Sequence, residues 1–254
     1  MGRVYLVGAG PGAPDLLTLR AAEILERAEV VFHDALVHPQ TLALAAHARK
    51  ILVGKRSGRH STAQSFINKR LVDAARKHGV VVRLKGGDPL LFGRAQEEID
   101  ALRKAGIDFE IVPGVTAATA AGAELGVSLT RRGLARHVAF VTPRAGRGEH
   151  ANDWAASVLA ADTAVIYMSA GLAEAISAEL IGRGKPEATP LVLVESATLP
   201  ERRILCGTLA DLPTLARQAG SGPAVLLLGE VLRDALADRA AGAIPEIQAY
   251  LRRA

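Results

Sequence analysis

The stretch VRLKGGDPLLFGR, residues 82–94, contains the break that shows how this chain is layered. It begins as an apolar strand, stops at Gly86 and Gly87, and continues into Asp88 and Pro89. Glycines leave room for a ligand beside the main chain. Because a residue before proline is held extended, we expect the Asp88 carboxylate to project rather than to cap the chain. A projecting acid beside bare backbone suits a ribose hydroxyl or a cationic group.

The apolar run that follows, Leu90–Phe92, has two interpretations. It can wall a flat ring such as adenine if the strand end binds a nucleoside. Alternatively, it is a buried trio behind an ordinary glycine turn and contacts no ligand. The residues alone leave both interpretations open.

Outward from this stretch, strand and helix patterns alternate through the first part of the chain. Helical patterns lie between apolar strands that do not themselves alternate polar and apolar residues, which is typical of a parallel sheet covered by helices on both faces. The strands are expected at residues 3–8, 29–34, 50–54, 79–87 and 108–114, and the helices at 15–28, 39–48, 63–79 and 95–106.

A second series begins after Pro113 and Gly114, with a helix of small residues. Two successive strands without a helix between them, 189–196 and 202–209, indicate a mixed sheet with an antiparallel pair. Further strands are expected at 137–142, 163–169 and 223–231. The fold class is therefore α/β, with a parallel-sheet domain over residues 1–113 and a mixed-sheet domain over 114–254. The loop TPRAGRGEHAND, residues 142–153, is expected to be the most mobile segment.

Composition narrows the class of function. The net charge of +5 is mild for a nucleic-acid binder, and the five Phe, three Tyr and one Trp lie mostly inside apolar runs, so base-stacking platforms are not expected. The basic groups fit solvated surface or a multiply anionic small molecule equally well. None of the seven histidines has metal-ligand spacing, and no apolar run approaches the roughly 18 residues that span a bilayer. We expect a cytoplasmic protein without a metal.

The motif GAGPGA, residues 8–13, satisfies the dinucleotide pattern G-x-G-x-x-G/A, and Asp34 follows about 20 residues later. A nicotinamide-dependent reductase is therefore one rival function. However, Pro11 has no N–H in a loop that would have to present amide donors to a pyrophosphate, and Pro14 weakens the pattern further. The motif instead predicts close approach of an uncharged group with an apolar contact from Pro11, or a tight turn without a ligand.

Three polar side chains follow neighbouring predicted strands. Asp34 ends the second strand, and Lys55 and Arg56 end the third. Because the ends of parallel strands meet at one edge of a sheet, an acid, an amine and a guanidinium are expected to line one cleft, where they can exchange protons with a substrate. A surface salt bridge is the alternative.

Several long motifs occur in order from residue 3 to about 231. They are VYLVGAGPGAPDLLTLRA, FHDALV, VGKRSGRHS, INKRLVDAARKHGVVVRLKGGDPLLFGR, FEIVPGVTAATAAGAELGVSLT and VIYM. Together they resemble the tetrapyrrole methyltransferase family, and within it the enzymes that act on uroporphyrinogen III.

The resemblance implies two α/β domains with S-adenosylmethionine in a cleft between them, and a homodimer. It also implies C-methylation of uroporphyrinogen III at C2 and C7, giving precorrin-2 through precorrin-1 for sirohaem or cobalamin, with S-adenosylhomocysteine as the second product. Asp34 is implied as proton acceptor, Lys55 as proton donor and Arg56 as a substrate contact. The implied cofactor contacts are Pro11, Gly86, Gly87, Asp88, Leu91, Thr116, Ala117, Met168 and Ala197.

The chain departs from the family pattern at three places. Thr142-Pro143-Arg144 stands where the family usually has Thr-Gly-His, Arg131 stands in the place of a histidine, and Ser196-Ala197-Thr198 replaces Asn-Gly-Thr. An arginine in place of a histidine keeps cation character but changes reach. Two rivals besides the reductase stay open, a methyltransferase of the same fold acting on a later precorrin and a nucleic-acid methyltransferase or binding module. The motif GKRSGRHS, residues 54–61, argues against the former.

Overall fold

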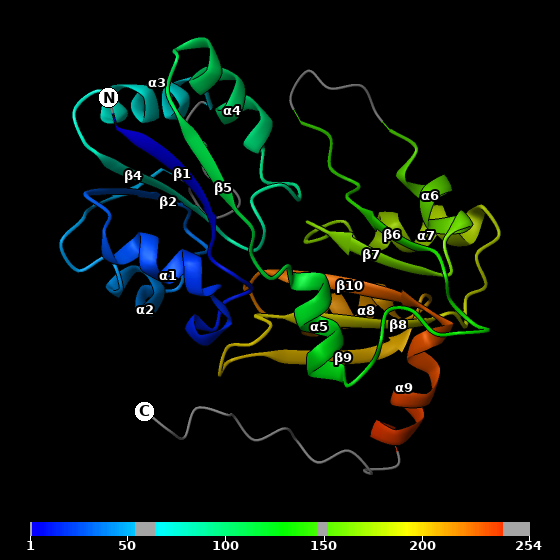
Figure 1. The fold of residues 1–254 in the computed structure, drawn as a ribbon. Helices are drawn as coiled ribbons and strands as arrows, with labels where there is room; N and C mark the ends of the chain where they lie inside the picture. Colours follow the sequence, from blue (N-terminus) through cyan, green and yellow to red (C-terminus); the bar gives the residue numbers. More distant parts are fainter. Residues whose placement is uncertain (1, 54–63, 147–151, 241–254) are drawn as a thin grey trace. The chain divides into compact units, whose positions relative to one another are not determined.

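The computed structural model describes residues 2–53, 64–146 and 152–240 (Figure 1). The chain divides into two compact units, Met1–Ala117 and Ala118–Ala254. The sequence places the boundary four residues earlier, between residues 113 and 114, and those bounds stay a prediction.

The described part of the first unit contains a five-stranded sheet in the order β3-β2-β4-β1-β5, with every neighbouring pair parallel. This confirms the predicted parallel sheet. The strands are β1 (Arg3–Gly8), β2 (Val30–His33), β3 (Arg49–Leu52), β4 (Val80–Lys85) and β5 (Phe109–Val112).

Helices cover both faces of this sheet, as Figure 1 shows. Alternate residues of each strand point to opposite faces, so Val4 and Leu6 of β1 join one apolar cluster while Val7 joins the other. The first cluster contains α3 (Gln64–Ala75) and α4 (Ala95–Lys104), and the second contains α1 (Leu19–Glu26) and the region of α2 (Pro39–Ala43).

The four described helices of the first unit are all shorter than predicted, and α1 and α2 show why. The helix expected over 15–28 starts only after Thr18, whose side chain accepts the N–H of Ala21 as an N-cap, and a short 3₁₀ turn, η1 (Pro14–Leu16), precedes it. The helix expected over 39–48 ends at Ala43. The chain then continues in three-residue turns, with Ala45 N–H bonded to Leu42 O, because it must reach β3 within a few residues.

The second unit has a mixed sheet in the order β6-β7-β10-β8-β9. The predicted antiparallel pair, β8 with β9, is confirmed, and the antiparallel character extends further because β10 also runs antiparallel to both β7 and β8. Among the described strands of the second sheet, β6 and β7 form the only parallel pair. The strands are β6 (Val138–Val141), β7 (Thr163–Tyr167), β8 (Pro190–Glu195), β9 (Arg203–Thr208) and β10 (Ala224–Gly229).

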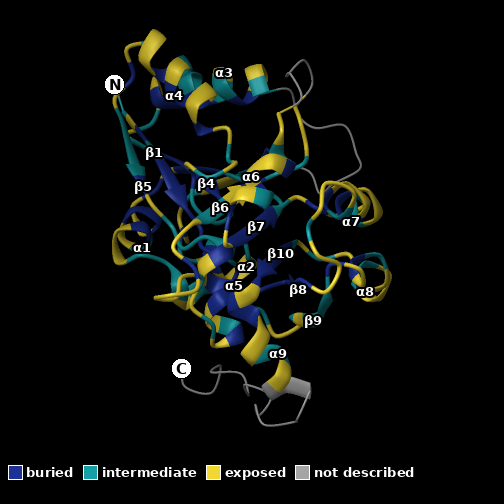
Figure 2. Ribbon diagram, turned by 90° about the vertical axis from the view of Figure 1, so that its right-hand side faces the viewer, coloured by how far each residue is buried: buried dark blue, intermediate teal, exposed yellow. Residues whose placement is uncertain are grey.

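Three helices pack against one face of the second sheet through buried residues such as Val158, Leu180 and Leu212. They are α6 (Trp154–Ala160), α7 (Ala173–Gly182) and α8 (Leu212–Gln218); the unit also holds η2 (Glu230–Leu232) and α9 (Arg233–Ala240), and α5 (Ala117–Leu125) starts at the boundary. The strands β8 and β10 are almost wholly buried, as the dark blue of Figure 2 shows. In the described residues, no helix combines the length and the apolar character that crossing a membrane requires.

Candidate functional site

The edge of the first sheet at which its parallel strands end is its carboxyl edge. There, the glycine loops that follow β1 and β4 are hydrogen-bonded to each other. Ala9 N–H donates to Lys85 O over 2.7 Å, and Gly10 and Gly87 exchange main-chain hydrogen bonds. The amides of Ala9 and Gly10 are therefore already used by the neighbouring strand, and Pro11 has none to offer. This geometry disfavours a pyrophosphate at the loop and with it the reductase alternative.

Two kinds of glycine meet at this edge. A Cβ on Gly8 would lie 2.6 Å from Gly114 Cα, and one on Gly114 would lie 2.4 Å from Gly87 O, so these glycines are required by the contact of three main-chain segments. Gly87 differs, because it has a φ of +67° and nothing lies within 4 Å of the position its Cβ would take. Bare backbone beside open space is thus present at Gly87, where the sequence predicts it.

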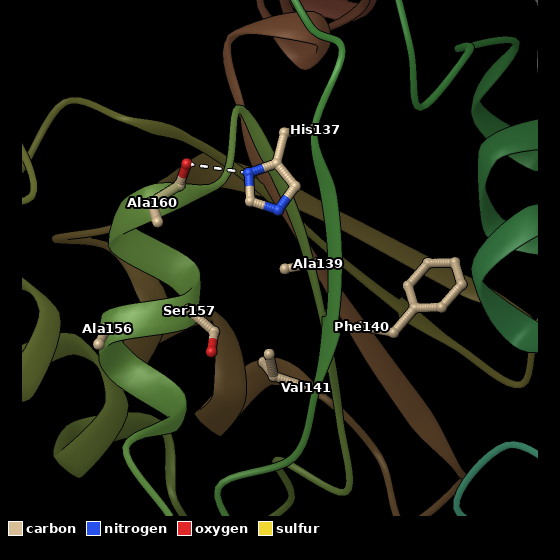
Figure 3. Close-up of a pocket in the computed structure, with 7 residues that line it drawn as sticks. All are labelled: His137, Ala139, Phe140, Val141, Ala156, Ser157 and Ala160. Carbon is tan, nitrogen blue, oxygen red and sulfur yellow. Dashed lines mark hydrogen bonds between the residues drawn. The ribbon is translucent and has the colours of Figure 1, made fainter.

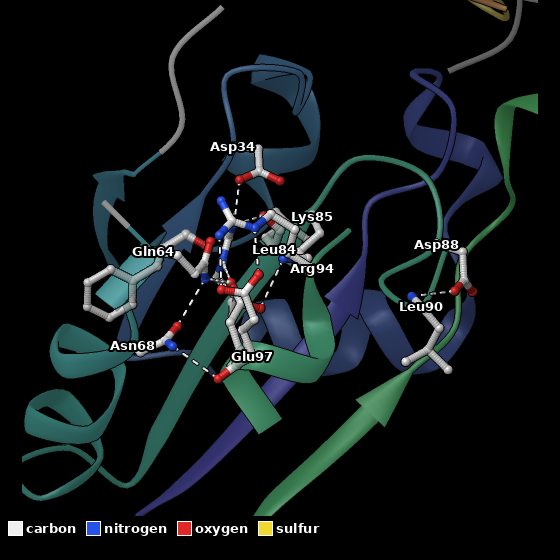
Figure 4. Close-up of polar contacts among 12 residues, drawn as sticks. Asp34, Gln64, Asn68, Leu84, Lys85, Asp88, Leu90, Arg94 and Glu97 are labelled. Atoms are coloured by element: carbon white, nitrogen blue, oxygen red, sulfur yellow. Dashed lines mark hydrogen bonds and ion pairs between the residues drawn. The ribbon is translucent and has the colours of Figure 1, made fainter. Parts of the chain in front are cut away.

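The expectation that the Asp88 carboxylate projects freely is wrong. Its Oδ1 accepts the N–H of Leu90 over 2.8 Å (Figure 4). Its Oδ2 accepts the N–H of Gly114 over 3.0 Å. Pro89 has no N–H, so the amide of Leu90 is the first that the acid can cap within its own turn. The carboxylate therefore fastens the loop after β4 to the chain that leaves β5. Each oxygen keeps a second lone pair for a ligand hydroxyl.

The apolar run after Asp88 is not a buried trio. Leu90 is 61% exposed and Phe92 is 38% exposed, while Leu91 is half-buried. Phe92 also has a φ of +53°, a conformation that a bulky residue adopts only where its surroundings require it. Of the two sequence interpretations, the geometry favours an apolar wall beside the glycine loop.

Asp34, which follows β2, is one end of a charged cluster that we call the Arg83 network: Asp34, Arg83, Lys85 and Glu98. Figure 4 labels Asp34 and Lys85 of this cluster. Arg83 Nη2 donates to Asp34 Oδ1 over 2.5 Å, and Arg83 Nε donates to Glu98 Oε1 over 2.9 Å. Lys85 Nζ donates to Glu98 Oε2, also over 2.9 Å. Glu98 is 0% exposed, and Arg83 and Lys85 are nearly as buried, whereas the Asp34 side chain is 27% exposed.

The Arg83 network pairs two cations with two anions away from water. Burial alone would lower the pKa of Arg83, but the charges of Asp34 and Glu98 outweigh it and raise the pKa above its ordinary value. Burial lowers the pKa of Lys85, and the charge of Arg83 lowers it further, although Glu98 acts in the opposite direction. Arg83 thus stays charged and holds the Asp34 carboxylate in one orientation.

The sequence analysis missed Arg83, Lys85 and Glu98. The sequence nevertheless contains a signal for them. Val81, Arg83 and Lys85 are spaced two residues apart and so lie on one face of β4, the face covered by α3 and α4. Glu98 lies between Ala95 and Ile99 on the buried side of α4. Charged residues at apolar positions of two facing elements predict a buried ion pair.

Lys55 and Arg56 lie outside the described residues, so their implied roles stay predictions. The chain re-enters the described part at Gln64, whose Nε2 donates to Glu98 Oε1 over 3.2 Å. Gln64, the first described residue after the segment that carries Lys55 and Arg56, therefore contacts the Arg83 network.

The remaining implied cofactor residues fall in both units. In the first unit, Pro11 is half-buried in the loop after β1, and Thr116 and Ala117 follow β5. In the second unit, Met168 follows β7 and Ala197 follows β8. Both strands run antiparallel to β10, which lies between them, so Met168 and Ala197 lie at the same edge of the second sheet.

The two residues of the second unit differ in exposure. Met168 is 42% exposed and has a φ of +54°, so it is not a core methionine. Ala197 is 7% exposed and lies between Ser196 and Thr198, which both have positive φ. The implied site thus consists of seven residues in the first unit and two in the second; whether these form one cleft stays a prediction.

A cavity of about 460 Å³ in the second unit lies elsewhere, between β6 and α6 (Figure 3). Its walls are mostly apolar, with polar groups from His137 and Ser157, and His137 Nδ1 lies 3.1 Å from Ala160 O. None of the residues that the sequence implies for catalysis or cofactor binding lines it. The cavity is therefore separate from the candidate site.

Residues 3–213 match the family model of tetrapyrrole (corrin/porphyrin) methylases. The chain belongs to this family. Siroheme synthase of Zymomonas mobilis is 46% identical over 231 residues, which cover 91% of this chain and 49% of that protein. Siroheme synthase of Pseudomonas putida is 47% identical over 240 residues, 93% of this chain and 52% of that protein. The chain thus spans about half the length of the curated relatives it matches.

Solved structures of this tetrapyrrole methylase fold match over almost the whole chain. Uroporphyrin-III C-methyl transferase from Thermus thermophilus, complexed with S-adenyl homocysteine, has 40% identity and a TM-score of 0.81, covering 92% of this chain and all of that one. A cobalt precorrin-4 methyltransferase has 31% identity and a TM-score of 0.79, covering 91% of this chain and 95% of that one. The predicted family, the methyltransferase class and the two-sheet α/β fold are confirmed.

Proposed function

We propose that the chain transfers methyl groups from S-adenosylmethionine to C2 and C7 of uroporphyrinogen III, giving precorrin-2 through precorrin-1. The observation that carries the proposal is the full-length likeness to the Thermus thermophilus enzyme whose structure holds S-adenyl homocysteine. The match covers all of that chain, so no part of the relative's methyltransferase lacks a counterpart here. A homodimer and a cytoplasmic location, both expected from the sequence, are part of the proposal.

The carboxyl edge of the first sheet fits a sulfonium nucleoside better than a dinucleotide. The open space beside Gly87 admits a flat group, and the amides of Ala9 and Gly10 in the first glycine loop are bonded within the protein. The spare lone pairs of Asp88 can accept ribose hydroxyls, and the exposed Leu90 supplies apolar surface for a ring. These features suit a ligand with hydroxyls and an apolar ring and with no phosphate to bind.

When bound, S-adenosylmethionine supplies an electrophilic methyl group. The reduced pyrrole carbon of the substrate is enamine-like and already nucleophilic, so the protein mainly aligns the two reactants and removes one proton. Asp34 is the proposed acceptor of that proton. Arg83 bonds its Oδ1, and within the described part of the chain Oδ2 has no hydrogen-bond partner, so this oxygen is available to the substrate.

Lys55 as proton donor and Arg56 as a substrate contact complete the proposal. The substrate carries eight carboxylates, and guanidinium groups bind carboxylates in bidentate fashion. The net charge of +5 favours such an anion.

The direct test is anaerobic incubation with uroporphyrinogen III and S-adenosylmethionine, followed by mass spectrometry. We expect products heavier by one and then by two methyl groups. Titration calorimetry with S-adenosylhomocysteine and with NADPH tests the cofactor separately. Binding of NADPH without binding of S-adenosylhomocysteine would return the reductase alternative to first place.

A further inference from the structure

Arg144 connects two neighbouring loops of the second unit. It follows β6, and its guanidinium reaches the turn that follows β7, where Nε donates to Met168 O over 2.8 Å and Nη2 donates to Ala170 O. The two strands are adjacent and parallel, so their carboxyl ends lie side by side. Arg144 is exposed, yet the Nε and Nη2 edge of its guanidinium is committed to main-chain carbonyls.

The residues before Arg144 fix where its side chain starts. Thr142 Oγ1 accepts the N–H of Arg144 over 3.2 Å, which closes a short turn, and Pro143 between them has a restricted φ. Thr142, which the family pattern shares, and the two departures Pro143 and Arg144 therefore contribute to one arrangement. A neutral histidine ring has a single N–H and could not donate to both carbonyls.

The turn that Arg144 holds contains unfavourable backbone geometry. Met168 has a φ of +54°, which costs a residue with a side chain about 1 kcal/mol, whereas Gly171 adopts its φ of +75° without steric cost. Inside the turn, Leu172 N–H donates to Ser169 O over 2.9 Å. Just before it, the hydroxyl of Tyr167 accepts the N–H of Ala118. Met168 thus follows an anchored residue, Tyr167, and its own carbonyl and that of Ala170 are bonded to Arg144.

We propose that Arg144 is a positioning residue that holds Met168 in its left-handed conformation and so shapes the methyl-donor site. This role rests on the proposed function, because the contact between Met168 and the methyl donor is implied only by the resemblance to the family. The role differs from side-on binding of a substrate carboxylate by Arg144. A carboxylate approaching side-on would need the edge of the guanidinium that Met168 and Ala170 already occupy.

The first experiment is hydrogen exchange on the protein without ligands, followed by mass spectrometry of the peptide that spans the turn. Loss of two charge-assisted hydrogen bonds in Arg144→Ala is expected to speed exchange of the Leu172 amide about tenfold. The control is Arg217→Ala, an exposed arginine on α8 whose guanidinium contacts only Thr214 and Glu174 among the described residues. Unchanged exchange in Arg144→Ala would overturn the inference, whatever the enzyme's reaction proves to be.

The second experiment distinguishes an effect on binding of the methyl donor from an effect on binding of the tetrapyrrole. In Arg144→Ala we expect affinity for S-adenosylhomocysteine to fall about tenfold by calorimetry, with the KM for uroporphyrinogen III unchanged. Arg144→Lys, which can bond one carbonyl, is expected to lie between wild type and Arg144→Ala. A raised KM for the tetrapyrrole with unchanged S-adenosylhomocysteine affinity would assign Arg144 to a substrate carboxylate and refute the proposal. If the wild type binds no S-adenosylhomocysteine, the proposed function fails, and the exchange experiment still decides whether Arg144 holds the turn.

Discussion

Replacing Glu98 by glutamine tests whether the Arg83 network supports the candidate site. The substitution keeps the shape of a fully buried side chain and removes its charge. Arg83 Nε and Lys85 Nζ each lie 2.9 Å from a Glu98 oxygen, and at an effective dielectric constant of about 20 each pair is worth roughly 6 kcal/mol of Coulomb attraction. Desolvation and the repulsion between the two cations offset much of this. Breaking a buried pair typically costs about 3–5 kcal/mol, which is the loss of unfolding free energy that we expect.

The assay must report on the first unit, because the single tryptophan, Trp154, lies in the second. Native-state hydrogen exchange of amides in β4 and α4 supplies such a reporter. Glu97→Gln is the matched control, since Glu97 is the adjacent residue on the same helix and its pair with Arg94 is exposed, which is worth at most about 1 kcal/mol. A loss below about 1 kcal/mol in Glu98→Gln would refute the reasoning.

The same variant makes a pH prediction through Lys85. Its folded pKa is lowered from the ordinary value of 10.5, so the unfolded chain binds more protons and stability rises with pH between the folded and the unfolded pKa. Glu98 acts to raise that pKa, and its loss therefore moves the start of this window to lower pH. The stability deficit of Glu98→Gln relative to wild type should shrink as the pH rises toward 10.5, the ordinary pKa of lysine. A deficit that stays constant over this range would contradict the assignment of the buried charge to Lys85.

Three further substitutions test the candidate site. Asp88→Ala removes the acceptor of two amides, Leu90 N–H and Gly114 N–H, and should lower the unfolding free energy by about 1–3 kcal/mol and weaken S-adenosylhomocysteine binding; denaturation and calorimetry that both match wild type would remove Asp88 from the site. Asp34→Asn should slow turnover while calorimetry shows cofactor affinity unchanged, and a wild-type rate would exclude Asp34 as proton acceptor. Arg56→Ala should raise the KM for uroporphyrinogen III in steady-state assays; an unaltered KM would point to another arginine.

Much of the fold follows from local patterns in the sequence. Apolar strands that do not alternate, bounded by glycines, predict the parallel sheet of the first unit, and two successive strands predict the antiparallel pair β8 and β9. These predictions succeed because hydrophobic period and turn residues act over a few neighbouring positions. Helix ends were less well predicted, as the early end of α2 at Ala43 shows, because the distance to the next strand decides them.

The sequence by itself determined the order of elements, the bare backbone at Gly87 and the family to which the chain belongs. Only the tertiary structure decided what the charged side chains contact. Asp88 caps Gly114, 26 residues away, and Arg83 meets Asp34 from a neighbouring strand. Arg144, which the sequence shows only as a departure from the family pattern, donates a hydrogen bond to the main-chain carbonyl of Met168. The reason is that a side-chain partner is set by strand order and register, which bring together residues far apart in the chain, whereas sequence patterns report on neighbours.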